Sequence, residues 1–119
     1  MAKIVLSGLP SKVLRQLATA FGIPIADMGA FVHIKERTLM RRIEANALLK
    51  PDESERAARL MRIYTRAVDV LADEGKAKLW LNRPLRALDN QSPLTVSATE
   101  PGAREVEQML GRLEHGVFA

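Results

Sequence analysis

Residues 24–46, PIADMGAFVHIKERTLMRRIEAN, encode two short helices separated by a tight turn. Pro24 suits the start of the first helix, because proline lacks only an N–H group that would have no helical partner there. This helix is expected to reach about Phe31. A turn over residues 32–34 follows, and a second helix covers about 35–46. A helix, a three-residue turn and a second helix form the helix-turn-helix pattern, whose second helix enters the major groove of DNA.

The second of these helices carries the densest basic segment of the chain. Residues 35–42 contain four positive side chains and one negative side chain. At about 100° per residue, Arg37 and Arg41 point away from Leu39, which faces the core. Arg42 lies only about 60° from Leu39, so we expect it at the edge of the core, either on a DNA phosphate or in a structural ion pair.

Apolar residues recur at helical spacing along nearly the whole chain, which predicts an all-α fold. Ser11 is available as the N-cap of a first helix over 11–21, and Gly22 as its stop. Strand-like alternation does not persist anywhere except in the doubtful segment Ile4–Leu6. Further helical elements are expected at 52–73, at 76–82, in one turn around 94–97, and in a last helix that Thr99 caps and Gly116 ends.

The longest predicted helix, about 52–73, has an apolar stripe and a basic face. The stripe is expected to contain Leu60, Met61, Tyr64, Ala67, Val68 and Leu71. The basic face is formed by Arg56, Arg59, Arg62 and Arg66. A solvated arginine face is favoured over a second phosphate-binding surface. The single tryptophan, Trp80, is expected in the core of the C-terminal region rather than at a contact surface.

The 119 residues suffice for one compact domain or two small helical ones. The net charge of +4 is unevenly distributed, since residues 1–64 carry 11 basic and 6 acidic side chains and residues 65–119 carry 7 and 8. The basic half is the half with the helix-turn-helix pattern. We therefore expect an N-terminal helix-turn-helix bundle over 1–50, joined by the long helix to a small helical region over 51–119.

The sequence argues against an enzyme, a metal site and a membrane span. It has no cysteine, which excludes thiolate chemistry and cysteine-based zinc sites. The two histidines lie on different predicted elements, and the chain contains no Gly-rich phosphate loop. Its apolar runs are interrupted by charge well before about 18 residues. We expect no catalytic residue, no metal ligand and no cofactor, in a soluble cytoplasmic protein.

Five segments follow one another in a characteristic order: RTLMRR (37–42), LKPDESER (49–56), AKLWL (77–81), PL (93–94) and GRLEHGVFA (111–119). Together they resemble the Xre-type antitoxins of RES–Xre toxin–antitoxin systems, which are similar to the broader MbcA/ParS/Xre group. The resemblance covers nearly the whole chain, from about Leu9 to Ala119. The ordered series is more specific than any one of its segments.

Two positions depart from the family pattern within the helix-turn-helix. His33 stands where the family usually has Gly, at a turn position that often adopts a positive φ. A non-glycine residue in that conformation costs on the order of 1 kcal/mol. Gly29 stands where a small Ala is common. Both departures concern the geometry of the DNA-binding region rather than the C-terminal region.

The resemblance implies an Xre-like helix-turn-helix followed by a toxin-binding region. The implied partner is a RES-domain toxin that consumes NAD⁺, and the antitoxin covers the active-site cleft of that toxin. The complex is also expected to bind its own operator DNA and to repress its operon. Because one monomer reads only a few base pairs, we expect a homodimer on an inverted repeat and a higher-order toxin–antitoxin complex.

Two sets of candidate site residues follow. The DNA-binding set is Lys35, Arg37, Thr38, Arg41 and Arg42. The toxin-binding set is Arg112, Glu114, His115, Gly116, Val117, Phe118 and Ala119. Arginines suit this DNA role because their guanidinium groups donate bidentate hydrogen bonds to guanine. An apolar terminal tail either frays in solvent or is buried in a partner, where an aromatic side chain such as Phe118 is a typical hot spot.

Two other functions remain open from the sequence. One is a stand-alone helix-turn-helix repressor that has no toxin partner. The other is a toxin-binding adaptor whose helix-turn-helix no longer reads DNA. Binding to the promoter of its own gene and binding to a toxin are the properties that separate these three possibilities.

Overall fold

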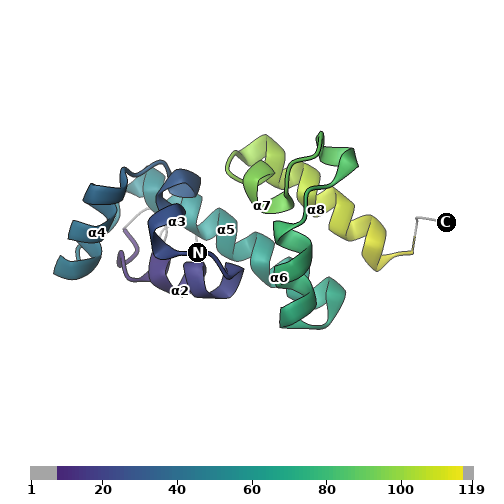
Figure 1. The fold of residues 1–119 in the computed structure, drawn as a ribbon, viewed down its shortest axis with the longest axis horizontal. Coiled ribbons are helices and arrows are strands. Elements are labelled where there is room, and N and C mark those ends of the chain that lie inside the picture. Colours follow the sequence, from purple (N-terminus) through teal and green to yellow (C-terminus); the bar gives the residue numbers. More distant parts are fainter. Residues whose placement is uncertain (1–7, 117–119) are drawn as a thin grey trace. The chain divides into compact units, whose positions relative to one another are not determined.

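The computed structural model describes residues 8–116, and every regular element in that range is helical. The predicted all-α fold is therefore confirmed, while the strand-like segment Ile4–Leu6 lies outside the described residues. The α-helices, labelled in Figure 1, are α2 (Val13–Phe21), α3 (Ile25–Val32), α4 (Glu36–Ala45), α5 (Pro51–Leu71), α6 (Glu74–Asn82), α7 (Pro93–Val96) and α8 (Glu100–Glu114). A 3₁₀ helix, η1 (Arg86–Leu88), lies between α6 and α7 in the sequence. Of these, only the 3₁₀ helix was not expected from the sequence.

The chain forms two compact units, Met1–Ala58 and Arg59–Ala119, and α5 contributes residues to both. The predicted boundary at residue 50 between a DNA-binding and a toxin-binding region concerns function, so these compact units do not decide it, and it stays a prediction. Among the described residues, no helix is both long enough and apolar enough to cross a bilayer.

In the first unit, α3 and α4 form the predicted helix-turn-helix. Leu39 of α4 and Val32 of α3 are fully buried. The turn between them passes through His33, which adopts the left-handed conformation with φ 59° and ends α3. Gly22 ends α2 in the same way, with φ 71°. The end of α2 lies where the sequence predicts it, and α3 ends one residue later than predicted, at Val32.

Ser11 does not cap α2, contrary to the sequence-based expectation. Lys12 occupies the N-cap position, and Ser11 is fully buried instead. Its hydroxyl donates a hydrogen bond of 2.9 Å to the carbonyl oxygen of Arg42, and its N–H donates to the carbonyl oxygen of Ala47 at 2.8 Å. Ser11 therefore ties the start of α2 to the end of α4, a role that only the tertiary structure creates.

Gly29 allows α3 to approach the turn that leads into α4. A Cβ atom at this position would lie 2.3 Å from the carbonyl oxygen of Ile34, which is closer than any real contact. The same kind of approach occurs in the second unit, where a Cβ atom at Gly102 would lie 1.9 Å from the carbonyl oxygen of Val96. Glycine at position 29 is therefore required by the packing of this helix-turn-helix.

In the second unit, side-chain caps begin three helices. Asp73 accepts a hydrogen bond from the N–H of Lys76 at the start of α6, and Ser92 caps α7. Thr99 caps α8 as predicted, with its hydroxyl 3.2 Å from the N–H of Gly102. The buried stripe of α5 is Leu60, Ile63 and Ala67, whereas the predicted stripe residue Met61 is 41% exposed.

We predict that Gly29→Ala destabilises the protein and that Gly111→Ala does not. The new methyl group at position 29 meets a backbone oxygen that must move, which costs on the order of 1–3 kcal/mol of unfolding free energy. At Gly111, inside α8, a Cβ atom would meet nothing within 4 Å, so alanine gains up to about 1 kcal/mol from its helix propensity. Circular dichroism during urea unfolding measures both. Equal stability of the two variants would contradict the close approach at Gly29.

Candidate functional site

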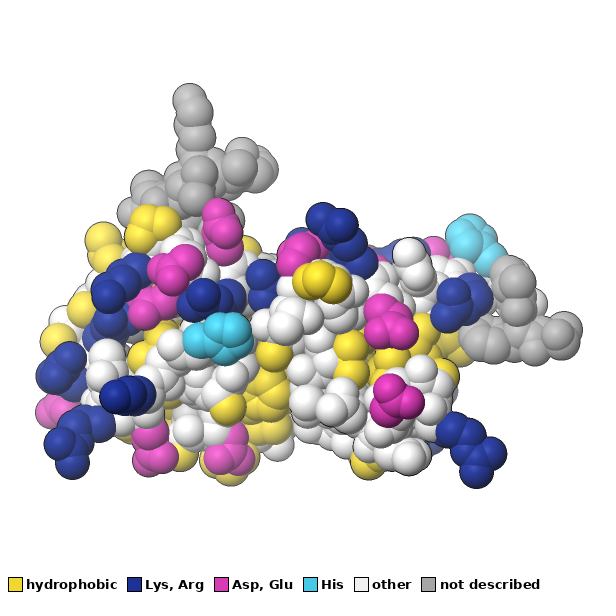
Figure 2. Space-filling view, turned by 90° about the horizontal axis from the view of Figure 1, so that it is seen from above, with side chains coloured by type: hydrophobic (Ala, Val, Ile, Leu, Met, Phe, Trp, Pro, Cys, Tyr) yellow, Lys and Arg dark blue, Asp and Glu magenta, His cyan; other side chains and the backbone are white. Residues whose placement is uncertain are grey.

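The exposed face of α4 is basic. Arg37 and Arg41 are exposed, as is Lys35 at the N-cap of the helix, while Leu39 is fully buried behind them. Thr38 is half-buried. In the space-filling view, Lys and Arg side chains gather over the part of the first unit where α4 lies, with some acidic side chains between them (Figure 2). The predicted orientation of the two exposed arginines on α4 is confirmed.

Arg42 belongs to the structure of the first unit rather than to its exposed face. Its guanidinium group forms an ion pair with Glu53, at the start of α5, and the Arg42 side chain is only 18% exposed. The same carboxylate oxygen of Glu53 accepts a hydrogen bond of 2.8 Å from the N–H of Lys50. Of the two roles that the sequence left open for Arg42, the structure shows the structural ion pair.

Arg56 contacts the end of the first helix of the helix-turn-helix. Its guanidinium group lies 3.4 Å from the carbonyl oxygen of Val32 and 3.5 Å from the carboxylate of Asp52. A positive charge at the C-terminal end of a helix compensates carbonyl groups that have no helical partner. Arg56 thus supports α3 at the residue that precedes the turn.

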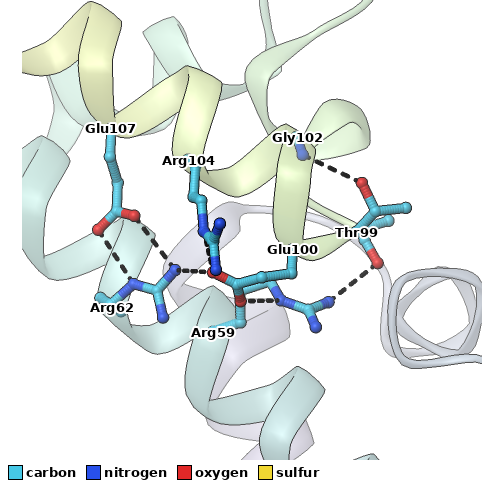
Figure 3. A network of polar contacts seen from close by, with 8 residues as sticks. Arg59, Arg62, Thr99, Glu100, Gly102, Arg104 and Glu107 are labelled. Carbon is cyan, nitrogen blue, oxygen red and sulfur yellow. Dashed lines mark hydrogen bonds and ion pairs between the residues drawn. The ribbon is translucent and has the colours of Figure 1, made fainter.

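Three arginines of α5 bind three glutamates of α8 in the second unit. Figure 3 shows part of this network, which we call the Arg–Glu ladder: Arg59 with Glu100, Arg62 with Glu100 and Glu107, and Arg66 with Glu114. The Nε–Oε distances are 3.1 Å for Arg59–Glu100 and 3.0 Å for Arg62–Glu107. The prediction of a solvated arginine face on α5 is therefore wrong, because these guanidinium groups are occupied within the protein.

The pair between Arg66 and Glu114 forms the C-terminal end of the ladder. Arg66 donates two hydrogen bonds to the two carboxylate oxygens of Glu114, at 3.1 Å and 2.6 Å. A bidentate pair of this kind fixes the orientation of both side chains. Glu114 is the last residue of α8. The position of the last turn of this helix is therefore set by a residue of α5.

Two carboxylates of the ladder, Glu100 and Glu114, have lowered pKa values. The hydrogen bond from Arg66 holds the pKa of Glu114 below its ordinary value, against an opposing effect of burial. Burial acts to raise the pKa of Glu100, but the hydrogen bond from Arg59 and the charge of Arg62 outweigh it, so that this pKa is lowered too. Both groups are thus stabilised in their charged form by the folded state.

The sequence contains a signal for the ladder that the prediction of a solvated arginine face overlooked. Glu100, Glu107 and Glu114 are separated by seven residues each, so they lie on one face of a helix. The spacing of three and four residues between Arg59, Arg62 and Arg66 places these side chains on one face as well. Two complementary faces of this length predict a helix pair.

Trp80 is not in the core, contrary to the sequence-based expectation. The fully buried side chains of α6 are Ala77 and Leu81, whereas Trp80 is half-buried. It lines a groove of about 410 Å³ on the second unit, together with Leu85, Arg86, Ala87, Met109, Arg112 and Leu113. We call this hollow the Trp80 groove.

The predicted toxin-binding residues divide into three groups in the structure. Arg112 lines the Trp80 groove, and Glu114 is held by Arg66. His115 is exposed and lies 3.9 Å from Glu114, while Gly116 adopts φ 66° beyond the helix end. Val117, Phe118 and Ala119 lie outside the described residues. Within residues 8–116, no cluster of His, Asp and Glu side chains could hold a metal ion.

Comparison with known proteins gives matches for both halves of the chain. Residues 1–62 match the model of the antitoxin Xre-like helix-turn-helix domain. Residues 66–116 match the model of the antitoxin Xre/MbcA/ParS C-terminal toxin-binding domain. Together the two models cover nearly the whole sequence, as does the series of segments on which the resemblance rested.

Three curated relatives are each named antitoxin Xre. The protein of Yersinia enterocolitica is 43% identical over 98 residues, which are 82% of this chain and 66% of that protein. The protein of Photorhabdus laumondii is 33% identical over 113 residues, or 94% of this chain and 76% of that protein. A Pseudomonas putida protein is 38% identical over 80 residues, 67% of this chain and 50% of that protein.

We predict that acid weakens the second unit through the ladder. A carboxylate whose pKa is lowered by folding contributes stability above its ordinary pKa, and that contribution is lost as the pH falls through the lowered value. The melting temperature should therefore fall as the pH drops below the ordinary carboxylate pKa of 4.5, and it should fall less in the double variant Glu100→Gln/Glu114→Gln. Fluorescence of Trp80, which belongs to this unit, follows the melting.

Glu105→Gln is the matched control for this experiment. Glu105 is exposed on α8, and no ion pair of its side chain is seen among the described residues. The control should keep the acid sensitivity of the unaltered protein. If all three proteins lose stability equally on acidification, the ladder does not carry the pH dependence.

Proposed function

Since this chain belongs to the Xre/MbcA/ParS antitoxin family, we propose that it neutralises a RES-domain toxin that consumes NAD⁺ and represses its own operon. As a member of this family it is an antitoxin and not an enzyme, with an Xre-like helix-turn-helix domain and a C-terminal domain that binds a toxin. Beyond this, we propose that the toxin has a RES domain, that the antitoxin covers its active site, and that the protein binds operator DNA.

The observation that carries the toxin part of the proposal is the bidentate pair between Arg66 and Glu114. It holds the last turn of α8 at the point from which the terminal segment starts. A segment that leaves a fixed helix end loses less conformational freedom on binding than one that leaves a frayed end. The residues from His115 to Ala119 are then presented to the active-site cleft of the toxin, with Phe118 as the apolar anchor.

The DNA part of the proposal rests on the exposed face of α4. Arg37 and Arg41 point to solvent from a helix whose opposite side is anchored by the buried Leu39. Their guanidinium groups are proposed to bind guanine edges, while Lys35 and Thr38 contact phosphates and set the register. Arg42, held by Glu53, keeps α4 in place. A homodimer on an inverted repeat supplies the second half-site.

The match over residues 66–116 speaks against a stand-alone repressor, because that function needs no toxin-binding domain. The exposed arginines of α4 speak against an adaptor that has lost DNA binding. These two alternatives are separated from the proposal by the two experiments that follow.

Arg41→Ala should weaken binding to the promoter of the operon by about 1–3 kcal/mol and relax the preference for one base pair. Fluorescence anisotropy with the native promoter and with promoters substituted at single positions measures both effects, and a salt series counts the phosphate contacts. The control is Lys78→Ala, which removes an exposed cation of the second unit. Unchanged affinity and salt dependence in Arg41→Ala would show that α4 is not the recognition helix.

Deletion of residues 115–119 should restore NAD⁺ consumption by the toxin. The deletion removes the terminal segment that we propose to cover the active site of the toxin, which we call the plug. It leaves α8 and the ion pair between Arg66 and Glu114 intact. NAD⁺ is measured in cells that express the toxin encoded beside this gene together with either the full-length or the shortened antitoxin. Circular dichroism of the shortened protein controls for its folding. Full inhibition by the shortened protein would remove the terminal segment from the mechanism.

A further inference from the structure

The Trp80 groove is an apolar surface with a charged rim. It is lined by the apolar side chains of Trp80, Leu85, Ala87, Met109 and Leu113 and by the exposed Arg86 and Arg112, which we call its rim. Trp80 also lines a smaller hollow of about 210 Å³, which includes Leu79, a side chain that is 66% exposed. A concave surface of this size, mostly apolar and with a few charged groups beside it, has the make-up of a typical binding site.

Two faces of α8 are occupied within the protein. Ala103, Val106 and Leu110 are fully buried in the core of the second unit. The three glutamates of the ladder bind the arginines of α5. Met109 and Leu113 lie four residues apart on the face that borders the groove. Both side chains are only half-buried, so part of their apolar surface is open to a partner at the groove.

The rim defines the chemistry of the occupant. Within residues 8–116, no ion pair is seen for either Arg86 or Arg112. A guanidinium group at the border of an apolar surface is well placed to bind a carboxylate of a partner through two hydrogen bonds. An apolar floor between two such groups selects a segment that combines an aromatic or branched apolar side chain with Asp or Glu.

We propose that the Trp80 groove is a second docking surface for the toxin, separate from the terminal segment. It binds a toxin segment with an apolar anchor that packs on Trp80 and a carboxylate that pairs with Arg86 or Arg112. The proposal rests on the proposed function only in taking a toxin as the partner. All seven residues that line the groove lie within 66–116, the range that matches the toxin-binding domain.

The groove also adjoins the proposed plug along the chain. Arg112 and Leu113 line it, and the terminal segment begins two residues later, at His115. One continuous partner can therefore contact the groove and the terminal segment together. The two contacts have different tasks: the groove supplies affinity and orientation, and the terminal segment covers the active site. Tryptophan and arginine are the side chains most often found at such energetic centres of interfaces.

The test separates the groove from the terminal segment. Affinity for the purified toxin is measured by calorimetry with the antitoxin shortened by residues 115–119, alone and with Arg86→Glu. We expect the shortened protein to bind the toxin, and Arg86→Glu to weaken this binding by about tenfold or more, because it places a carboxylate opposite the partner's carboxylate. Lys78→Glu, the same charge reversal on the exposed side of α6, should leave the affinity unchanged.

Trp80 is the only tryptophan of the chain, so 5-fluorotryptophan in the antitoxin gives a single ¹⁹F resonance from the groove. Addition of unlabelled toxin should shift it, and the shift should be lost in Arg86→Glu at the same toxin concentration. A shortened antitoxin that does not bind the toxin, or equal effects of Arg86→Glu and Lys78→Glu, would overturn the inference. If the toxin stays inhibited after deletion of residues 115–119, only the proposed role of the terminal segment in covering the active site is overturned.

Two other occupants of the groove have distinct signatures in the same experiment. A second copy of this chain would shift the resonance as the antitoxin alone is concentrated. The chain's own terminal segment would protect Trp80 in the free protein, so that deletion of residues 115–119 moves the resonance as far as the toxin does. Either result would overturn the proposal.

Discussion

Ion pairs along α5 are the interactions on which both units of this protein depend. At the start of the helix, Glu53 binds Arg42 of α4. Further along, the Arg–Glu ladder binds α8 and ends in the pair between Arg66 and Glu114. The same helix therefore supplies the contact that holds α4 in one unit and the contacts that hold α8 in the other.

These pairs differ in physical character. Exposed ion pairs contribute little stability one by one, so the ladder matters through its geometry more than through its strength. Its members select one rotation of α8, which puts Val106 and Leu110 into the core and leaves Met109 and Leu113 at the Trp80 groove. The pair between Arg42 and Glu53 is more buried, and loss of one partner would leave the other charge uncompensated.

Features that depend on neighbours in the sequence were predicted well. The cap at Thr99 and the left-handed helix ends at Gly22 and His33 involve groups only a few residues apart. The exposed side of α4 followed from helical periodicity, because a helix with one buried leucine has only one opposite face. The main errors concern Ser11, Trp80 and the arginines of α5, because their contacts lie far away along the chain or are absent from the local pattern.

The sequence by itself determined the helices, the helix-turn-helix and the family to which this antitoxin belongs, because caps, periodicity and ordered motifs are local properties. Only the tertiary structure decided which charged side chains form ion pairs within the protein. A guanidinium group on α5 has the same sequence environment whether it faces water, DNA or a glutamate about forty residues later. Its partner is chosen by the way α5 and α8 pack, which the local sequence around each arginine does not encode.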